Sequence, residues 1–102
     1  MATGKTSGLG LGGILSAAFE EQLIWNKGRP IIGHDPALWR MDDHENLIYR
    51  HAYGNRQSEH GWEIDHRAPT GLGGGDDLAN KRPLHWRANA QLGGLLSALL
   101  AR

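Results

Sequence analysis

Cysteine is missing from the 102-residue sequence. Its absence excludes disulfide bonds, thiolate zinc sites and cysteine nucleophiles together. An excess of one charge is missing too, because eleven basic and eleven acidic side chains cancel. A strongly basic nucleic-acid-binding coat is therefore excluded, although a local basic surface is not. No apolar run approaches the ~20 residues of a membrane span, so we expect no membrane partner.

Glycine is abundant instead. Fifteen glycines predict long loops and a modest core, and the length fits one small domain. We predict a flexible, glycine-rich N-terminus over residues 1–13 and one α+β domain over residues 14–102. Lys5 and the small residues up to Ala18 have the outline of a signal peptide, but four glycines weaken its helix. We therefore expect a cytoplasmic protein, with secretion as the minor alternative.

Hydrophobic spacing predicts the main elements. Residues 14–25 form a short amphipathic helix, residues 39–53 a strand or hairpin, and residues 62–66 a short strand. A second helix is predicted from about Leu84 to Leu92, where Gly93 and Gly94 end it. In a domain this small, aromatic side chains are expected in the core; the four tryptophans are Trp25, Trp39, Trp62 and Trp86.

The informative segment is residues 61–89, GWEIDHRAPTGLGGGDDLANKRPLHWRAN. Asp65-His66 closes the predicted strand, thirteen residues intervene before Asn80, and eight more lead to Asn89. This pattern resembles the HNH endonuclease family, in its variant with Asn at the last position. The upstream stretches KGRPIIGHDPALWRMD and YGNRQSEHGW are similar to the leader of many small members. The resemblance implies a ββα-metal core at about residues 61–93 with flanking short helices.

The resemblance also implies roles for the motif residues. His66 becomes the general base, with Asn80 bonding across the glycine loop to orient it, and Asp65 and Asn89 become oxygen ligands of a divalent ion (Mg, Mn or Zn). A neutral imidazole can accept a proton from water near pH 7, and carboxylate and amide oxygens suit a hard cation. Adjacent strand residues point to opposite faces. Either the strand distorts at Asp65-His66, or the base approaches phosphate from the far side of the metal.

His85 has two interpretations. It lies where many family members place a cysteine of a structural zinc clamp, but Ala88 occupies the partner position, so no such clamp can form. His85 is then either a third metal or phosphate ligand or, as we prefer, a residue at the start of a helix.

Basic residues that commonly follow the last motif position in the family are missing here, because residues 90–94 carry no charge. Four basic residues beside the motif are candidates for DNA phosphates: Arg67, Lys81, Arg82 and Arg87.

The motif therefore favours a metal-dependent endonuclease that hydrolyses DNA with little sequence specificity, with a larger assembly as a source of specificity. Two alternatives remain, namely a weak or inactive DNA-binding module with the HNH fold, and an interaction protein that uses its leucine-rich C-terminal tail. We expect that tail to pack on the N-terminal helix of a monomer, with a dimer as the alternative. The residues predicted to receive it are Ile14, Leu15 and Phe19.

Overall fold

The computed structural model describes residues 11–101, so most of the segment predicted to be flexible, residues 1–10, lies outside the described part. The first described element is helix α1 (Leu11–Trp25), which begins three residues before the predicted start. Two antiparallel hairpins follow, β1 (Trp39–Met41) with β2 (Leu47–Tyr49) and β3 (Trp62–His66) with β4 (Lys81–His85). Helix α2 (Trp86–Leu100) closes the chain. The predicted α+β class, hairpin and strand at residues 62–66 are confirmed.

A small core joins α1 to both hairpins. Ile24 and Trp25 at the end of α1 pack on Ile48 of β2 and Trp62 of β3, all fully buried. The rings of Trp25 and Trp62 lie 5.2 Å apart between centroids, and each indole N–H donates to a backbone carbonyl. Trp39 and Trp86 are only half-buried. The prediction that the tryptophans lie in the core is therefore confirmed fully for Trp25 and Trp62.

Helix α2 differs from its prediction at both ends. Residues 84 and 85 belong to β4, and the helix continues through Gly93 and Gly94 to Leu100. A glycine inside a helix costs only about 1 kcal/mol relative to alanine, and the leucines and alanine beyond the pair are strong helix formers. The predicted stop was wrong because glycine ends a helix only where the following residues favour leaving it.

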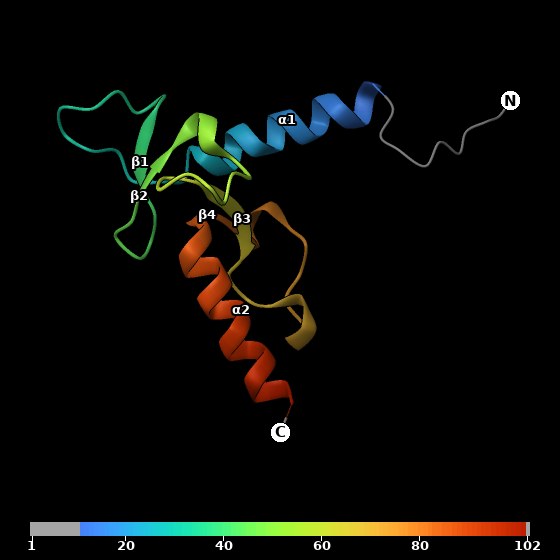
Figure 1. The fold of residues 1–102 in the computed structure, drawn as a ribbon. Helices are drawn as coiled ribbons and strands as arrows, with labels where there is room; N and C mark the ends of the chain where they lie inside the picture. The colour runs from blue at the N-terminus through green and yellow to red at the C-terminus, as the bar shows by residue number, and fades with distance from the viewer. Residues whose placement is uncertain (1–10, 102) are drawn as a thin grey trace, which may run out of the picture.

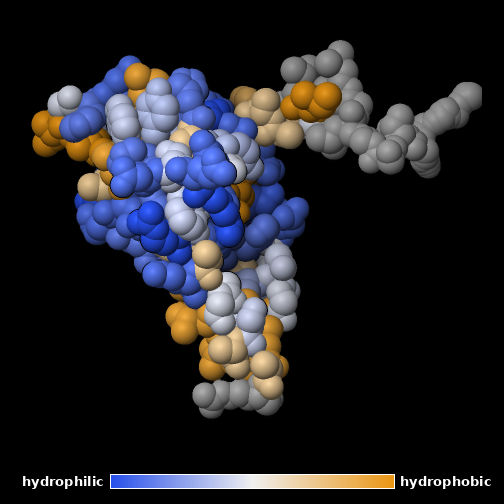
Figure 2. All heavy atoms as spheres, in the orientation of Figure 1, coloured by the Kyte–Doolittle hydropathy of each residue, from blue (hydrophilic) through white to orange (hydrophobic). Residues whose placement is uncertain are grey.

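The predicted packing of the tail on α1 is also wrong. The outer turns of α2 extend away from the hairpins (Figure 1), and hydrophobic residues gather over that end of the molecule (Figure 2). Leu95, Leu99 and Leu100 are exposed, and so are Ile14 and Phe19 on α1. The side chain of the other predicted receiver, Leu15, lies outside the described part. Within residues 11–101, no helix combines the length and apolar character that crossing a membrane requires.

Candidate functional site

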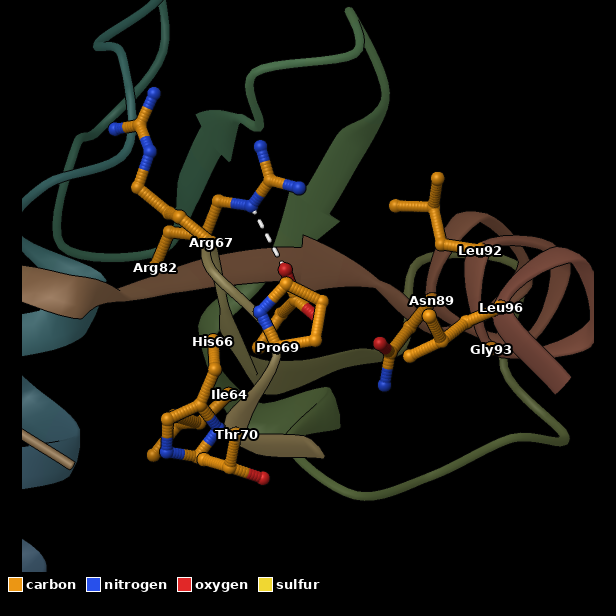
Figure 3. A pocket seen from close by; sticks show the side chains of 11 residues that line it. Ile64, His66, Arg67, Pro69, Thr70, Arg82, Asn89, Leu92, Gly93 and Leu96 are labelled. Carbon is orange, nitrogen blue, oxygen red and sulfur yellow. Dashed lines mark hydrogen bonds and ion pairs between the residues drawn. The ribbon is translucent and has the colours of Figure 1, made fainter. Parts of the chain in front are cut away.

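The hairpin β3–β4 and helix α2 surround one pocket of about 420 Å³ (Figure 3). Both strands contact α2, and the loop of residues 67–80 connects them. The pocket is lined from the end of β3, the loop, β4 and one face of α2. Three of the four motif residues line it: Asp65, His66 and Asn89.

Asp65 is held by its cross-strand partner. The register pairs Asp65 with Arg82, and the Arg82 Nε donates to Asp65 Oδ2 at 2.9 Å. Both side chains are largely buried, each 15% exposed. The other oxygen, Oδ1, has no hydrogen bond within the described part of the chain, so it is the Asp65 atom open to a ligand.

Asn89 is fixed by a carboxylate on the neighbouring strand. Its Nδ2 donates to Glu63 Oε1 at 2.8 Å, and Arg56 donates to both Glu63 oxygens at 2.6 and 2.8 Å. The hydrogen bond from Arg56 lowers the pKa of Glu63 from its ordinary value, which keeps the carboxylate charged. Because the amide nitrogen is engaged, the carbonyl oxygen of Asn89 is its remaining polar atom, and no described residue bonds it.

His66 is held by Asp76, a residue that the motif did not indicate. Its Nε2 lies 2.8 Å from Asp76 Oδ1. The strand stays regular through His66, since the pairing with Lys81 continues to that position, and Figure 3 shows the imidazole directed away from Arg82. Asp65 and His66 therefore point to opposite faces of an undistorted strand, which is the second of the two predicted alternatives. The only sequence signal for Asp76 was its place in an acidic pair after the glycine run.

Asn80 bonds across the glycine loop, but to backbone rather than to His66. Its Oδ1 accepts from Ala68 N at 2.9 Å, and its Nδ2 donates to the carbonyls of Ala68 and Gly75 at 3.0 and 2.6 Å. Asn80 therefore sets the shape of the loop that carries Asp76. Any effect on His66 passes through that loop.

His85 is buried and lies at the start of α2. Its Nδ1 accepts from Arg87 N at 3.0 Å, and its Nε2 lies 2.7 Å from the carbonyl of Glu59. Both ring nitrogens are thus engaged, and His85 does not line the pocket. These contacts favour its interpretation as a helix-start residue.

The four basic candidates fall into two groups. Arg67 and Arg82 line the pocket, and each has a guanidinium nitrogen within 3.6 Å of Asp43 Oδ2. By contrast, Lys81 is buried with its ammonium committed to ion pairs, and the Arg87 guanidinium lies over the Trp86 ring, 4.9 Å from its centroid. The first pair alone faces the pocket.

The donor atoms indicate which metal would fit. Among residues 11–101, no group of three or more His, Cys, Asp or Glu side chains could hold a metal ion. The two predicted ligands, Asp65 and Asn89, offer one carboxylate oxygen and one amide oxygen. An all-oxygen pair with the remaining positions left to water suits Mg²⁺ or Mn²⁺ better than a closed zinc site, which needs nitrogen or sulfur.

A search against protein-family models, curated proteins and solved structures finds no match to this chain.

Proposed function

We propose that this protein is a divalent-metal-dependent HNH-type endonuclease that hydrolyses DNA phosphodiester bonds with little sequence specificity. The observation that carries the proposal is that Asp65, His66 and Asn89 all line one pocket, with the His66 imidazole on the opposite side of β3 from the Asp65 carboxylate. They come from a strand and a helix, and the connection strand–loop–strand–helix over residues 62–100 is the one that a ββα-metal core requires.

Each side chain has a chemical task in this proposal. His66 takes the proton from the attacking water through Nδ1, which has no hydrogen-bond partner among the described residues. Asp65 and Asn89 would hold the ion, which when bound stabilises charge on the phosphate and the leaving oxygen. Arg67 and Arg82 bind the phosphodiester oxygens in place of the Asp43 carboxylate, which they contact here and which carries the same single negative charge.

Plasmid cleavage tests the proposal. We expect nicking in Mg²⁺ or Mn²⁺ that stops on addition of a chelator, and we expect His66→Ala to lower the rate by about 10²–10⁴-fold, the usual loss of a general base. His44→Ala is the matched control because His44 is an exposed histidine in the β1–β2 turn. Cleavage by His66→Ala at the rate of the parent protein contradicts the assignment.

The exposed leucines of α2 favour a second candidate, an interaction protein. Leu95, Leu99 and Leu100 are each more than half exposed, and apolar patches on small proteins commonly mark contact surfaces. Sedimentation at several concentrations distinguishes this candidate, since it predicts an increase in mass that Leu99→Ser abolishes.

A further inference from the structure

The contact between His66 and Asp76 fixes which imidazole nitrogen carries a proton. A carboxylate only accepts hydrogen bonds, so the 2.8 Å contact between Asp76 Oδ1 and His66 Nε2 places the proton on Nε2. In a neutral imidazole, Nδ1 then keeps its lone pair. That nitrogen has no hydrogen-bond partner within residues 11–101 and is the atom able to accept a proton.

The loop holds Asp76 in place although its side chain is 81% exposed. Asn80 bonds the carbonyl of Gly75, the residue directly before Asp76, and Gly74 N donates to the Pro69 carbonyl at 2.9 Å. A Cβ on Gly74 would lie 1.8 Å from the Ala68 carbonyl oxygen, so only glycine allows this close approach of the two halves of the loop. The position of Asp76 is thus built by its neighbours.

A buried cation completes the arrangement. The Lys81 Nζ lies 3.4 Å from Asp76 Oδ1 and 2.9 Å from Glu20 Oε1 on α1. The hydrogen bond with His66 is the main cause that lowers the pKa of Asp76, and the hydrogen bond and charge of Lys81 lower it further. Asp76 therefore stays ionised well into the acidic range, and a carboxylate rather than a carboxylic acid faces His66 near neutral pH.

We infer that Asp76 is a positioning residue for His66, holding the imidazole with its proton on Nε2 and its Nδ1 directed to the attacking water. The inference rests on the proposed nuclease function for its catalytic consequence, whereas the contact itself is measurable without any activity. The loop between the strands brings Asp76, ten residues further along the chain, back to the His66 ring.

The test compares Asp76→Ala and Asp76→Glu with Asp77→Ala. Asp77 is the matched control because it is the adjacent carboxylate in the same loop and makes no side-chain hydrogen bond with His66. Each protein carries ¹⁵N-labelled histidine, and His66→Ala assigns the ring signals. Long-range ¹H–¹⁵N spectra near pH 8 report the proton position, plasmid cleavage gives kcat and KM separately, and thermal melts confirm folding.

We expect the two His66 ring-nitrogen shifts to move toward each other in Asp76→Ala, as its proton is shared between Nε2 and Nδ1. We also expect kcat to fall about tenfold with KM unchanged, the low end of losses for a carboxylate partner of a functional histidine. Asp76→Glu should recover most of the parent ring-nitrogen shifts and most of the parent kcat. Asp77→Ala should change neither the shifts nor kcat.

Unchanged ring shifts in Asp76→Ala overturn the inference, whatever the activity. Changed shifts with an unchanged kcat overturn the catalytic role of the contact. If the parent protein cleaves no DNA with any divalent ion, the proposed function fails, and the spectra alone then decide whether Asp76 sets the proton position of His66.

Discussion

The two hairpins of this protein pair their strands in the same antiparallel way but close them differently. Residues 42–46 form a tight turn between β1 and β2, whereas residues 67–80 form a long glycine-rich loop between β3 and β4. Asp42 organises the first and is 3% exposed. Asn80 organises the second, and its three hydrogen bonds go to the backbone of that loop.

The difference concerns what each organising side chain reaches. Asp42 accepts from three donors within its own turn and from His85 N at 2.9 Å, which ties the first hairpin to the start of α2. Asn80 reaches no other element. Ion pairs of Asp76 and Arg67 connect this loop to the rest of the fold, but the side-chain bonds of Asn80 stay inside the loop. We therefore expect the loss of Asp42 to lower the stability of the whole fold more than the loss of Asn80 does.

Removing Asp42 should have the largest effect on stability. We expect Asp42→Ala to lower the free energy of unfolding by about 2–3 kcal/mol, since a buried carboxylate with four donors is lost and the backbone N–H of His85 is left without a partner. Urea denaturation measures the change. Asp43→Ala, the exposed neighbour, is the control and should cost under about 0.5 kcal/mol.

Metal affinity tests the second hairpin. Asp65→Asn should weaken Mn²⁺ binding by more than about tenfold in calorimetry, because it removes the one anionic donor of the proposed pair. Asn89→Ala should weaken binding less, since it removes a neutral donor. Equal affinity in both variants and the parent protein would place any ion elsewhere.

Asn80→Ala should loosen the loop and spare the rest. The loss of three partly exposed hydrogen bonds should cost about 1–2 kcal/mol and speed hydrogen exchange in residues 67–80. Exchange in β1 and β2 should stay as it is. A uniform increase of the exchange rates over both hairpins would contradict the expectation that Asn80 stabilises only its own loop.

Low pH should weaken the hydrogen bond by which Glu63 holds Asn89. The folded pKa of Glu63 is lowered by the hydrogen bond from Arg56, from an ordinary value of 4.5. Its contribution to stability is therefore complete above about pH 4.5 and is lost as the pH falls through the lowered folded value. The urea midpoint of Glu63→Gln should approach that of the parent protein as the pH falls below 4, and a constant difference would remove Glu63 as the cause.

Deleting residues 97–102 should have the smallest effect. Leu99 and Leu100 are exposed, so their removal should change the free energy of unfolding by less than about 0.5 kcal/mol, while Leu96 remains to line the pocket. A large loss of stability, measured at several protein concentrations, would show that this end of α2 is covered in solution.

Local pattern was enough for several elements. In residues 62–66, apolar Trp62 and Ile64 alternate with polar side chains, and this pattern predicts a short strand. The structure has a strand with these bounds. Asp65, His66 and Asn89, which the motif singled out, line one pocket formed by β3, its loop, β4 and α2. The glycine pair at residues 93–94 was misleading, because helix continuation depends on the residues that follow as much as on the glycines.

The sequence by itself determined the α+β class, the motif spacing and a tryptophan-based core, because these follow from short-range periodicity and residue type. Only the tertiary structure decided which group each carboxylate meets. Asp76 joins His66 across ten residues, Glu63 joins Asn89 across 26, and Asp42 joins His85 across 43. A carboxylate carries no mark of its partner in sequence, since the partner is chosen by strand register, by loop shape and by the packing of α2 on the hairpin.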